Sequence, residues 1–427
     1  MIRKEKYFPG DGIDIFNLKV VPWATQFDHF SIFLGNGFNN RFGSFNTFAA
    51  VGSVSVFTTK SNDPFKEWIS FYESNKDWMI GYLNYDLKNK LNELNSNNTD
   101  RLDAPEIYFF IPETLIFLQE DGLMICSVDD PNDIYKEITD LKPAVSKNKE
   151  IIIECDTSHE EYIEKVLAIQ DQIREGDFYE LNYCIEYYTT IKSPDLLSIY
   201  QRLNSISPMP FSVFQKLDKH YILSASPERF LKKTGKQLIA QPMKGTMKRS
   251  PDPAIDEKLK SLLKNSEKEI AENMMIIDLT RNDLTKNAVT GSISVPALFE
   301  IHSFSHIHQM VSTITATLDV GKHFIDAIKD AFPMGSMTGA PKICVMEAIE
   351  KYENSRRSMF SGAAGYISPE GDFDFNVLIR SIFYSYTTKF LKFNVGSAIT
   401  IDSKAEDEYL ESQLKAKALM KALYQIR

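Results

Sequence analysis

Alternating hydrophobic and polar positions predict strands in both halves of the chain. The clearest alternation covers 373–401, where Phe373 and Phe375 occupy every second position, as in a strand with one buried face. We expect Arg380 to lie in the first strand of that range and Gly396 to interrupt the second. Further strands are expected at 45–51, 54–56, 78–86, 107–112, 114–118, 179–183, 211–217, 221–224 and 236–240. The strands at 107–112 and 114–118 are expected to pair with each other.

Helical spacing predicts helices between these strands. Tyr162, Val166, Ile169 and Ile173 recur on one face of the segment 159–175. A last helix is expected after Ser403, which forms a capping box with Glu406 three residues later. The other predicted helices cover 64–75, 254–280 as one helix or two, 324–332 and 341–352. Strands and helices mixed in this way predict an α/β protein.

Composition narrows the class of protein. The net charge of -10, without a run of consecutive basic residues, argues against binding to nucleic acid or to an anionic membrane surface. No apolar run is long enough to span a bilayer, and no signal segment follows Met1, so we expect a cytoplasmic protein. The four cysteines are far apart, which predicts buried free thiols rather than disulfides or a zinc site. The charged stretch 142–150 is the expected connection between 1–150 and 151–427.

Two side chains stand beside residues that constrain the backbone. Lys244 lies between Pro242, which lacks a backbone donor, and Gly245, which permits a tight turn or a close approach to a ligand. It is either a solvated lysine beside a turn or an amine positioned as a nucleophile or ligand contact. Glu228, after a proline at a strand end, is either an ion-pair partner or a carboxylic acid of raised pKa that protonates a leaving hydroxyl.

Two predicted helices each carry a pair of glutamates. Glu269 and Glu272 are three residues apart, as are Glu408 and Glu411, so each pair shares one helix face. Lys415 continues the second face. Each pair is either a solvated surface or, if the two helices meet, part of a carboxylate group that needs a cation. Mg²⁺ suits such a group because it takes one or two carboxylates, several waters and an anionic substrate group.

The turn at 333–342 and Arg380 are candidates for binding anions. Two glycines, Ser336 and Thr338 precede the helix that Pro341 begins, and N–H groups at a helix N-terminus bind anions. The alternative is a well-capped helix start. Arg380 needs an anionic partner if it is buried, which is either a carboxylate ligand or an internal acid.

These segments together resemble the chorismate-utilising enzymes over about residues 159–424. The resemblance rests on separate motifs that occur in family order: Gly176-Asp177-x-Tyr179-x-x-Asn182, Ser226-Pro227-Glu228, Pro242-x-x-Gly245-Thr246, Lys268-Glu269-x-Ala271-Glu272-Asn273, Asp278-Leu279-x-Arg281-Asn282-Asp283, Gly335-Ser336-x-Thr338-Gly339-Ala340-Pro341-Lys342 and Asp402-Ser403…Glu408-Tyr409-x-Glu411…Lys415. A weaker motif, Gly81-Tyr82-x-x-Tyr85-Asp86, extends the resemblance into 1–150.

The resemblance implies a single large α/β (α+β) domain with two facing, mostly antiparallel sheets flanked by helices. It implies 1–150 as the N-terminal part of the fold, 151–427 as the chorismate-binding catalytic part, chorismate as substrate and Mg²⁺ as cofactor. It assigns Glu272 and Glu411 to Mg²⁺, with Glu269 and Glu408 beside them, and Glu228 to general acid catalysis. It assigns substrate contacts to Thr246, Gly245, Gly335, Ser336, Thr338, Gly339, Gln309, Phe360, Arg380, Gly396, Ala398 and Lys415.

Lys244 distinguishes branches of this family. Anthranilate and isochorismate synthases usually carry alanine here, whereas aminodeoxychorismate synthases typically carry lysine. An amine that attacks ring C2 expels the C4 hydroxyl, and ammonia can then enter at C4 and expel the lysine. The resemblance thus implies a lysine adduct on the way from chorismate to 4-amino-4-deoxychorismate, for 4-aminobenzoate and folate synthesis. Anthranilate synthase chemistry is the first alternative, and isochorismate synthase chemistry the second.

Two positions depart from the family pattern. Glu180 stands where aminating relatives usually carry glutamine and water-activating ones lysine, and its carboxylate could take a proton from lysine or ammonium. Gln309 stands where anthranilate synthases carry histidine, although His308 is adjacent. No segment outside the matched region is large enough for a glutamine amidotransferase domain. A separate amidotransferase subunit, or free ammonia, is therefore the expected nitrogen source.

Overall fold

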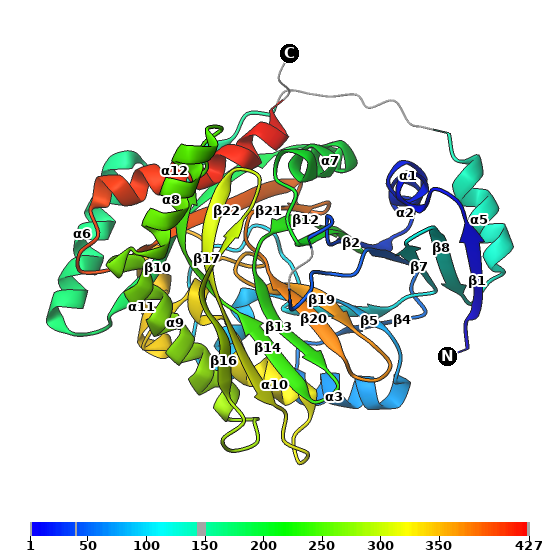
Figure 1. The fold of residues 1–427 in the computed structure, drawn as a ribbon, viewed down its shortest axis with the longest axis horizontal. Coiled ribbons are helices and arrows are strands. Elements are labelled where there is room, and N and C mark those ends of the chain that lie inside the picture. The colour runs from blue at the N-terminus through cyan, green and yellow to red at the C-terminus, as the bar shows by residue number, and fades with distance from the viewer. Residues whose placement is uncertain (1, 39–40, 143–150, 425–427) are drawn as a thin grey trace.

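The computed structural model describes residues 2–38, 41–142 and 151–424, and two antiparallel sheets form its frame (Figure 1). The 12-stranded sheet has the order β1 (Lys4–Pro9), β8 (Gly122–Ser127), β7 (Thr114–Gln119), β3 (Phe48–Val51), β2 (His29–Leu34), β11 (Phe211–Leu217), β12 (His220–Ser226), β21 (Ser381–Ser385), β22 (Phe390–Ile399), β10 (Glu180–Thr190) and β18 (Gly339–Ala340), with β9 (Glu154–Cys155) beside β10. The 10-stranded sheet has the order β15 (Met243–Lys248), β17 (Ile307–Thr317), β14 (Gln237–Gln241), β13 (Arg229–Thr234), β20 (Phe373–Val377), β19 (Ala363–Ile367), β5 (Met79–Leu83), β6 (Ile107–Ile111) and β4 (Ser55–Thr58), with β16 (Ser294–Ser303) beside β17.

Helices cover the outer faces and one end of this frame. They are α1 (Gly12–Ile15), α2 (Val21–Ala24), α3 (Pro64–Asn75), α4 (Lys88–Asn92), α5 (Pro131–Asp140), α6 (His159–Glu175), α7 (Leu196–Ile206), α8 (Pro253–Lys264), α9 (Glu267–Thr285), α10 (Phe324–Ala331), α11 (Lys342–Tyr352) and α12 (Ala405–Leu423). Helix α12 packs on β22 and against α6 and α7, while α8 and α9 pack on β15 and β17 (Figure 1). Strand β22 of one sheet, strand β15 of the other and the long helices α9 and α12 therefore lie around one region, which contains the cavity described below.

Buried apolar side chains form two clusters. One contains residues of both sheets, such as Phe33, Phe48, Phe109 and Phe375, and so joins the two sheets. The other lies between the 12-stranded sheet and helices that include α6, α7 and α12. This arrangement confirms the predicted fold class of two facing sheets flanked by helices. Within the described ranges, no helix has the length and apolar character needed to cross a membrane.

The predicted pairing of 107–112 with 114–118 is wrong. β6 pairs with β5 and β4 in one sheet, whereas β7 pairs with β3 and β8 in the other. Only Pro112 and Glu113 lie between these strands, and neither is a residue that favours the positive φ of a two-residue hairpin turn. The chain therefore crosses between the sheets at this point.

Three local predictions near the C-terminus are also wrong. Arg380 lies in the connection between β20 and β21, with a positive φ of 52°, and not in a strand. Strand β22 continues through Gly396. The N-cap of α12 is Lys404, without a side-chain cap, because the buried hydroxyl of Ser403 donates to Glu408 Oε1 at 2.8 Å instead. The contact of Ser403 with Glu408 depends on the tertiary structure, and the spacing of a capping box does not predict it.

Other predictions have mixed outcomes. The segment 254–280 forms two helices, α8 and α9, with Ser266 as the N-cap of the second. All four cysteines are free, but only Cys126 and Cys184 are buried, whereas Cys155 and Cys344 are exposed. The predicted connection at 142–150 lies, apart from Lys142, outside the described residues.

Candidate active site

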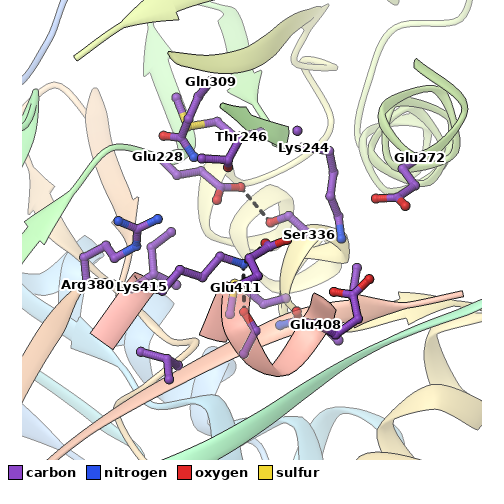
Figure 2. A pocket seen from close by; sticks show the side chains of 18 of the residues that line it. Glu228, Lys244, Thr246, Glu272, Gln309, Ser336, Arg380, Glu408, Glu411 and Lys415 are labelled. Atoms are coloured by element: carbon purple, nitrogen blue, oxygen red, sulfur yellow. Dashed lines mark hydrogen bonds and ion pairs between the residues drawn. The ribbon is translucent and has the colours of Figure 1, made fainter. Parts of the chain in front are cut away.

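Most of the predicted site residues surround one cavity between β15, β22, α9 and α12 (Figure 2). The structure brings together Glu228, Lys244, Gly245, Thr246, Glu269, Glu272, Gln309, Ser336, Phe360, Arg380, Gly396, Ala398, Glu408, Glu411 and Lys415. The two glutamate pairs, which the sequence could not place relative to each other, thus face the same space.

Some residues of this lining were not predicted. They are Asn182, Met243, Lys268, Met337, Ile379, Asn394 and Val395. Lys268 and Asn182 belong to the family motifs, so the motifs could have identified them as site residues. Asn394 lies two residues before Gly396 on β22, and residues two apart share one face of a strand, so the strand period could have found it.

Four predicted residues do not line the cavity. The hydroxyl of Thr338 donates to the carbonyl of Met334, and Gly339 pairs with Leu181 in the sheet. Gly335 lines a smaller neighbouring cavity. Glu180 reaches the site indirectly, through Lys244. The turn at 333–342 therefore presents Ser336 and Met337 to the cavity, whereas the first turn of α11 does not line it.

A β-bulge aims Lys244 into the cavity. Between Met243 and Thr246, strand β15 has one residue more than its partner β17, whose matching residues are Val311 and Gln309. A bulge re-aims side chains and bends the strand, and Gly245 permits it by adopting a φ of 90°. A Cβ on Gly245 would also approach Glu269 Oε2 to 2.9 Å. The local sequence Lys-Gly therefore determines where the amine points.

Lys244 forms a buried ion pair with Glu180. Its Nζ donates to Glu180 Oε1 at 2.6 Å, while the second carboxylate oxygen of Glu180 is buried without a hydrogen-bond partner. Burial alone would lower the pKa of Lys244, but the carboxylates of Glu180, Glu272 and Glu228 outweigh it and raise the pKa. Its side chain is only 10% exposed and is held by Glu180, which excludes the interpretation as a solvated surface lysine.

Glu228 is a buried carboxyl group that ionises with difficulty. It follows β12, and its Oε1 accepts a hydrogen bond from the Ser336 hydroxyl at 2.6 Å (Figure 2). Burial raises its pKa to about 7, against the opposing effects of Ser336 and Lys244. No cation pairs directly with it among the described residues. The raised pKa keeps a larger share of this carboxyl group protonated at neutral pH than in an ordinary glutamate, as a proton donor requires.

The four other carboxylates come from two helices, Glu269 and Glu272 from α9 and Glu408 and Glu411 from α12. Burial raises the pKa of Glu272 to about 7, and neighbouring carboxylates add to the effect. Hard oxygen donors of this kind fit Mg²⁺. In the described ranges no three acidic, His or Cys side chains converge closely enough to hold a metal alone. Mg²⁺ also takes ligands from water and from anionic substrate groups.

Arg380 and Lys415 lie on the side of the cavity opposite Glu272 (Figure 2). Lys415 Nζ contacts Glu411 Oε1 at 2.7 Å and the carbonyl of Gly396 at 2.8 Å. A Cβ on Gly396 would meet the carbonyl of Tyr183 at 2.3 Å, so glycine allows β22 to lie close to β10 here. The guanidinium of Arg380 has no ion-pair partner in the described part of the chain. Two cations on one side of the cavity fit a ligand with carboxylate groups.

Gln309 lines the cavity, whereas His308 does not. Adjacent residues of a strand point to opposite faces, and His308 turns to Ser303 and to Asp256, with its Nε2 at 3.2 Å from Asp256 Oδ1. The side-chain oxygens of Gln309 and Asn394 are buried without hydrogen-bond partners. Buried polar atoms are normally paired, so these two are candidates for contacts with a ligand.

Comparison with known proteins places the chain in a family. The sequence pattern of the chorismate binding enzyme family matches residues 35–421. Aminodeoxychorismate synthase component 1 of Escherichia coli K12 is 40% identical over 266 residues, which cover 62% of this chain and 58% of that protein. The Klebsiella aerogenes protein of the same name is 33% identical over 348 residues, covering 81% and 76%.

A solved structure shares the fold. The crystal structure of anthranilate synthase component I from Streptococcus pneumoniae superimposes with a TM-score of 0.78 at 22% identity, covering 90% of this chain and 94% of that one. The matched range includes every residue that lines the cavity. The chain therefore belongs to the chorismate binding enzymes.

Proposed function

We propose that this chain converts chorismate and ammonia to 4-amino-4-deoxychorismate, as the chorismate-binding component of an aminodeoxychorismate synthase. The main support for this proposal is the amine of Lys244, which the bulge in β15 directs into the cavity that Glu228 also lines. The names of the two relatives support this assignment. The product would serve 4-aminobenzoate and folate synthesis, and the cytoplasmic location expected from the sequence stays a prediction.

Lys244 must lose a proton before it can act as a nucleophile. Glu180 is the nearest acceptor, since its Oε1 already accepts a hydrogen bond from Nζ at 2.6 Å. Moving the proton to Glu180 converts a buried ion pair into two neutral groups, which costs less in a dry site than creating a new charge. Substrate that displaces water from the cavity would favour this neutral state.

The neutral amine then attacks ring C2 of chorismate and forms a C–N bond. The ring double bonds shift, and the C4–O bond breaks as Glu228 gives its proton to the departing hydroxyl, which leaves as water. Ammonia attacks C4, the double bonds shift back, and the bond between Nζ and C2 breaks. The proton lost by ammonia returns to Glu228, and the proton held by Glu180 returns to Lys244, so both residues end as they began.

The remaining residues position the substrate. Arg380, Lys415 and Thr246 would hold the substrate carboxylates, with the backbone at Gly396 and Ala398, and Phe360 and Gln309 would contact the ring and its side chain. Mg²⁺ would be held by Glu272 and Glu411, with Glu269 and Glu408 beside them. When bound, it supplies charge neutralisation for a substrate carboxylate. A glutamine amidotransferase subunit is the proposed source of ammonia.

Product analysis tests the proposal. The chain is incubated with chorismate, Mg²⁺ and an ammonium salt, and the products are separated and identified by mass. We expect 4-amino-4-deoxychorismate without release of pyruvate, because Gln309 stands in the cavity and His308 faces away. Accumulation of anthranilate and pyruvate would instead identify an anthranilate synthase component, and isochorismate would identify a water-using enzyme.

A further inference from the structure

Lys268 stands among the four carboxylates of the cavity. It lies in the first turn of α9, and its Nζ is 3.8 Å from Glu272 Oε1 on its own helix. The same Nζ is 3.5 Å from Glu408 Oε1 on α12. Lys268 thereby connects the two helices whose carboxylates face each other across the cavity.

The charges around Lys268 are more numerous than in an ordinary surface ion pair. Besides Glu272 and Glu408, the carboxylates of Glu269 and Glu411 line the same cavity as Lys268. Glu272 Oε1 is buried and has no hydrogen-bond partner, so the ammonium is its nearest source of positive charge on α9. Glu411, by contrast, is already paired with Lys415 at 2.7 Å.

Lys268 can also leave this position without moving the backbone. Its side chain is 50% exposed, against 12% for Glu272 and 6% for Glu408. A lysine carries its charge on a flexible four-carbon stem, which can swing into solvent. Glu272 and Glu408 cannot follow, because their side chains are largely buried.

We propose that Lys268 is the resident counter-cation of this carboxylate group, and that a divalent cation must displace its ammonium to reach Glu272 and Glu408. This inference rests on the Mg²⁺ part of the proposed function. A tethered ammonium competes for the same oxygens at a high effective concentration, so it weakens metal binding to the chain without substrate. Lys268 would thus act on the affinity for the metal and not on the reacting atoms.

The test measures binding of Mn²⁺ to the full chain without chorismate, from the electron paramagnetic resonance signal of free Mn²⁺. K268Q should bind Mn²⁺ at least about tenfold more tightly than the unmodified chain, whereas K268R, which keeps the charge, should not. K260Q is the matched control, because Lys260 also pairs with a glutamate of its own helix, Glu257 at 3.6 Å, but lies outside the cavity. Since neither chorismate nor ammonia is present, the result does not depend on which product the enzyme makes.

Equal or weaker Mn²⁺ binding by K268Q would overturn the proposal, as would tighter binding by K260Q. A second measurement covers the possibility that K268Q folds poorly. Its Tm should fall without divalent cations and should rise with added Mg²⁺ by more than the Tm of the unmodified chain. A Tm that Mg²⁺ leaves unchanged would show that the carboxylates do not exchange the ammonium for a metal.

Discussion

Two lysine–glutamate pairs on strand β10 look alike in isolation. Glu180 pairs with Lys244 at 2.6 Å, and Glu186 pairs with Lys392 at 2.7 Å. Both glutamates are almost fully buried, at 1% and 2% exposure, and they are six residues apart on the same face of the strand. The two pairs therefore have the same chemistry and nearly the same geometry, although the side chain of Lys244 is 10% exposed and that of Lys392 is 2% exposed.

Their surroundings differ. Lys392 lies on β22 and also donates to the carbonyl of Arg356 at 2.8 Å, within the packed interior. Lys244 projects from a bulge into a cavity, beside Glu228 and Glu272. A buried ion pair by itself thus says little about function. The cavity and the bulge separate a candidate site from an internal cross-link, because both glutamates have a buried carboxylate oxygen without a hydrogen-bond partner.

The largest effect expected in the cavity follows replacement of Glu228, the proposed general acid. Glu228→Gln keeps the size of the side chain and its contact with Ser336 but cannot deliver the proton. We expect turnover of chorismate to fall by about 100-fold or more, the usual contribution of a positioned acid, while chorismate still binds. Steady-state kinetics with a separate binding measurement checks this. A loss of less than about threefold would remove Glu228 from the mechanism.

Breaking the internal pair should affect stability only. Lys392→Met leaves Glu186 buried with only the longer contact to Arg101, whose Nη1 is 3.9 Å from Glu186 Oε1. Loss of one partner of a buried pair typically costs about 3–5 kcal/mol of the free energy of unfolding. Urea denaturation measures this cost. Turnover per folded molecule should stay within about twofold of the original, because Lys392 does not line the cavity. A loss of activity in a fully folded variant would show that the Glu186–Lys392 pair also contributes to activity.

Lys244→Ala removes the lysine of the pair that lies in the cavity. Because the covalent route is lost, we expect turnover per folded molecule to fall at least about tenfold with chorismate binding retained. Rapid-quench analysis followed by mass spectrometry should detect an adduct on the unmodified chain and none on the variant. Unchanged turnover would show that Lys244 is as structural as Lys392.

The smallest expected effect concerns pH. The pKa of Glu228 is raised to about 7, so the folded chain binds more protons than the unfolded chain above pH 4.5. Its contribution to stability is present below the unfolded pKa and is lost as pH rises through about 7. Relative to the original, Glu228→Gln should therefore gain about 1 kcal/mol of stability between about pH 6 and pH 8. Chemical denaturation at both pH values tests the sign, and a constant difference would contradict the raised pKa.

Much of the site was predictable from residues that act locally. The spacing of Glu269 with Glu272, and of Glu408 with Glu411, placed each pair on one helix face, and both pairs line the cavity. Predictions failed where distant contacts decided. Ser403 bonds to Glu408 rather than capping α12, and Arg380 leaves the strand with a positive φ because the chain turns there from β20 to β21.

The sequence by itself determined the α/β class of the fold, most of the helices, many of the strands and most of the residues that line the cavity. Such features depend on hydrophobic period and on short motifs, which act over a few residues. Only the tertiary structure decided that α9 and α12 face each other, that a bulge aims Lys244 at Glu180, and that Lys268 stands between the carboxylates. These contacts join positions that are far apart in the sequence, such as Glu180 and Lys244, which are separated by 64 residues. Only the packing of the two sheets and their helices brings such positions into contact.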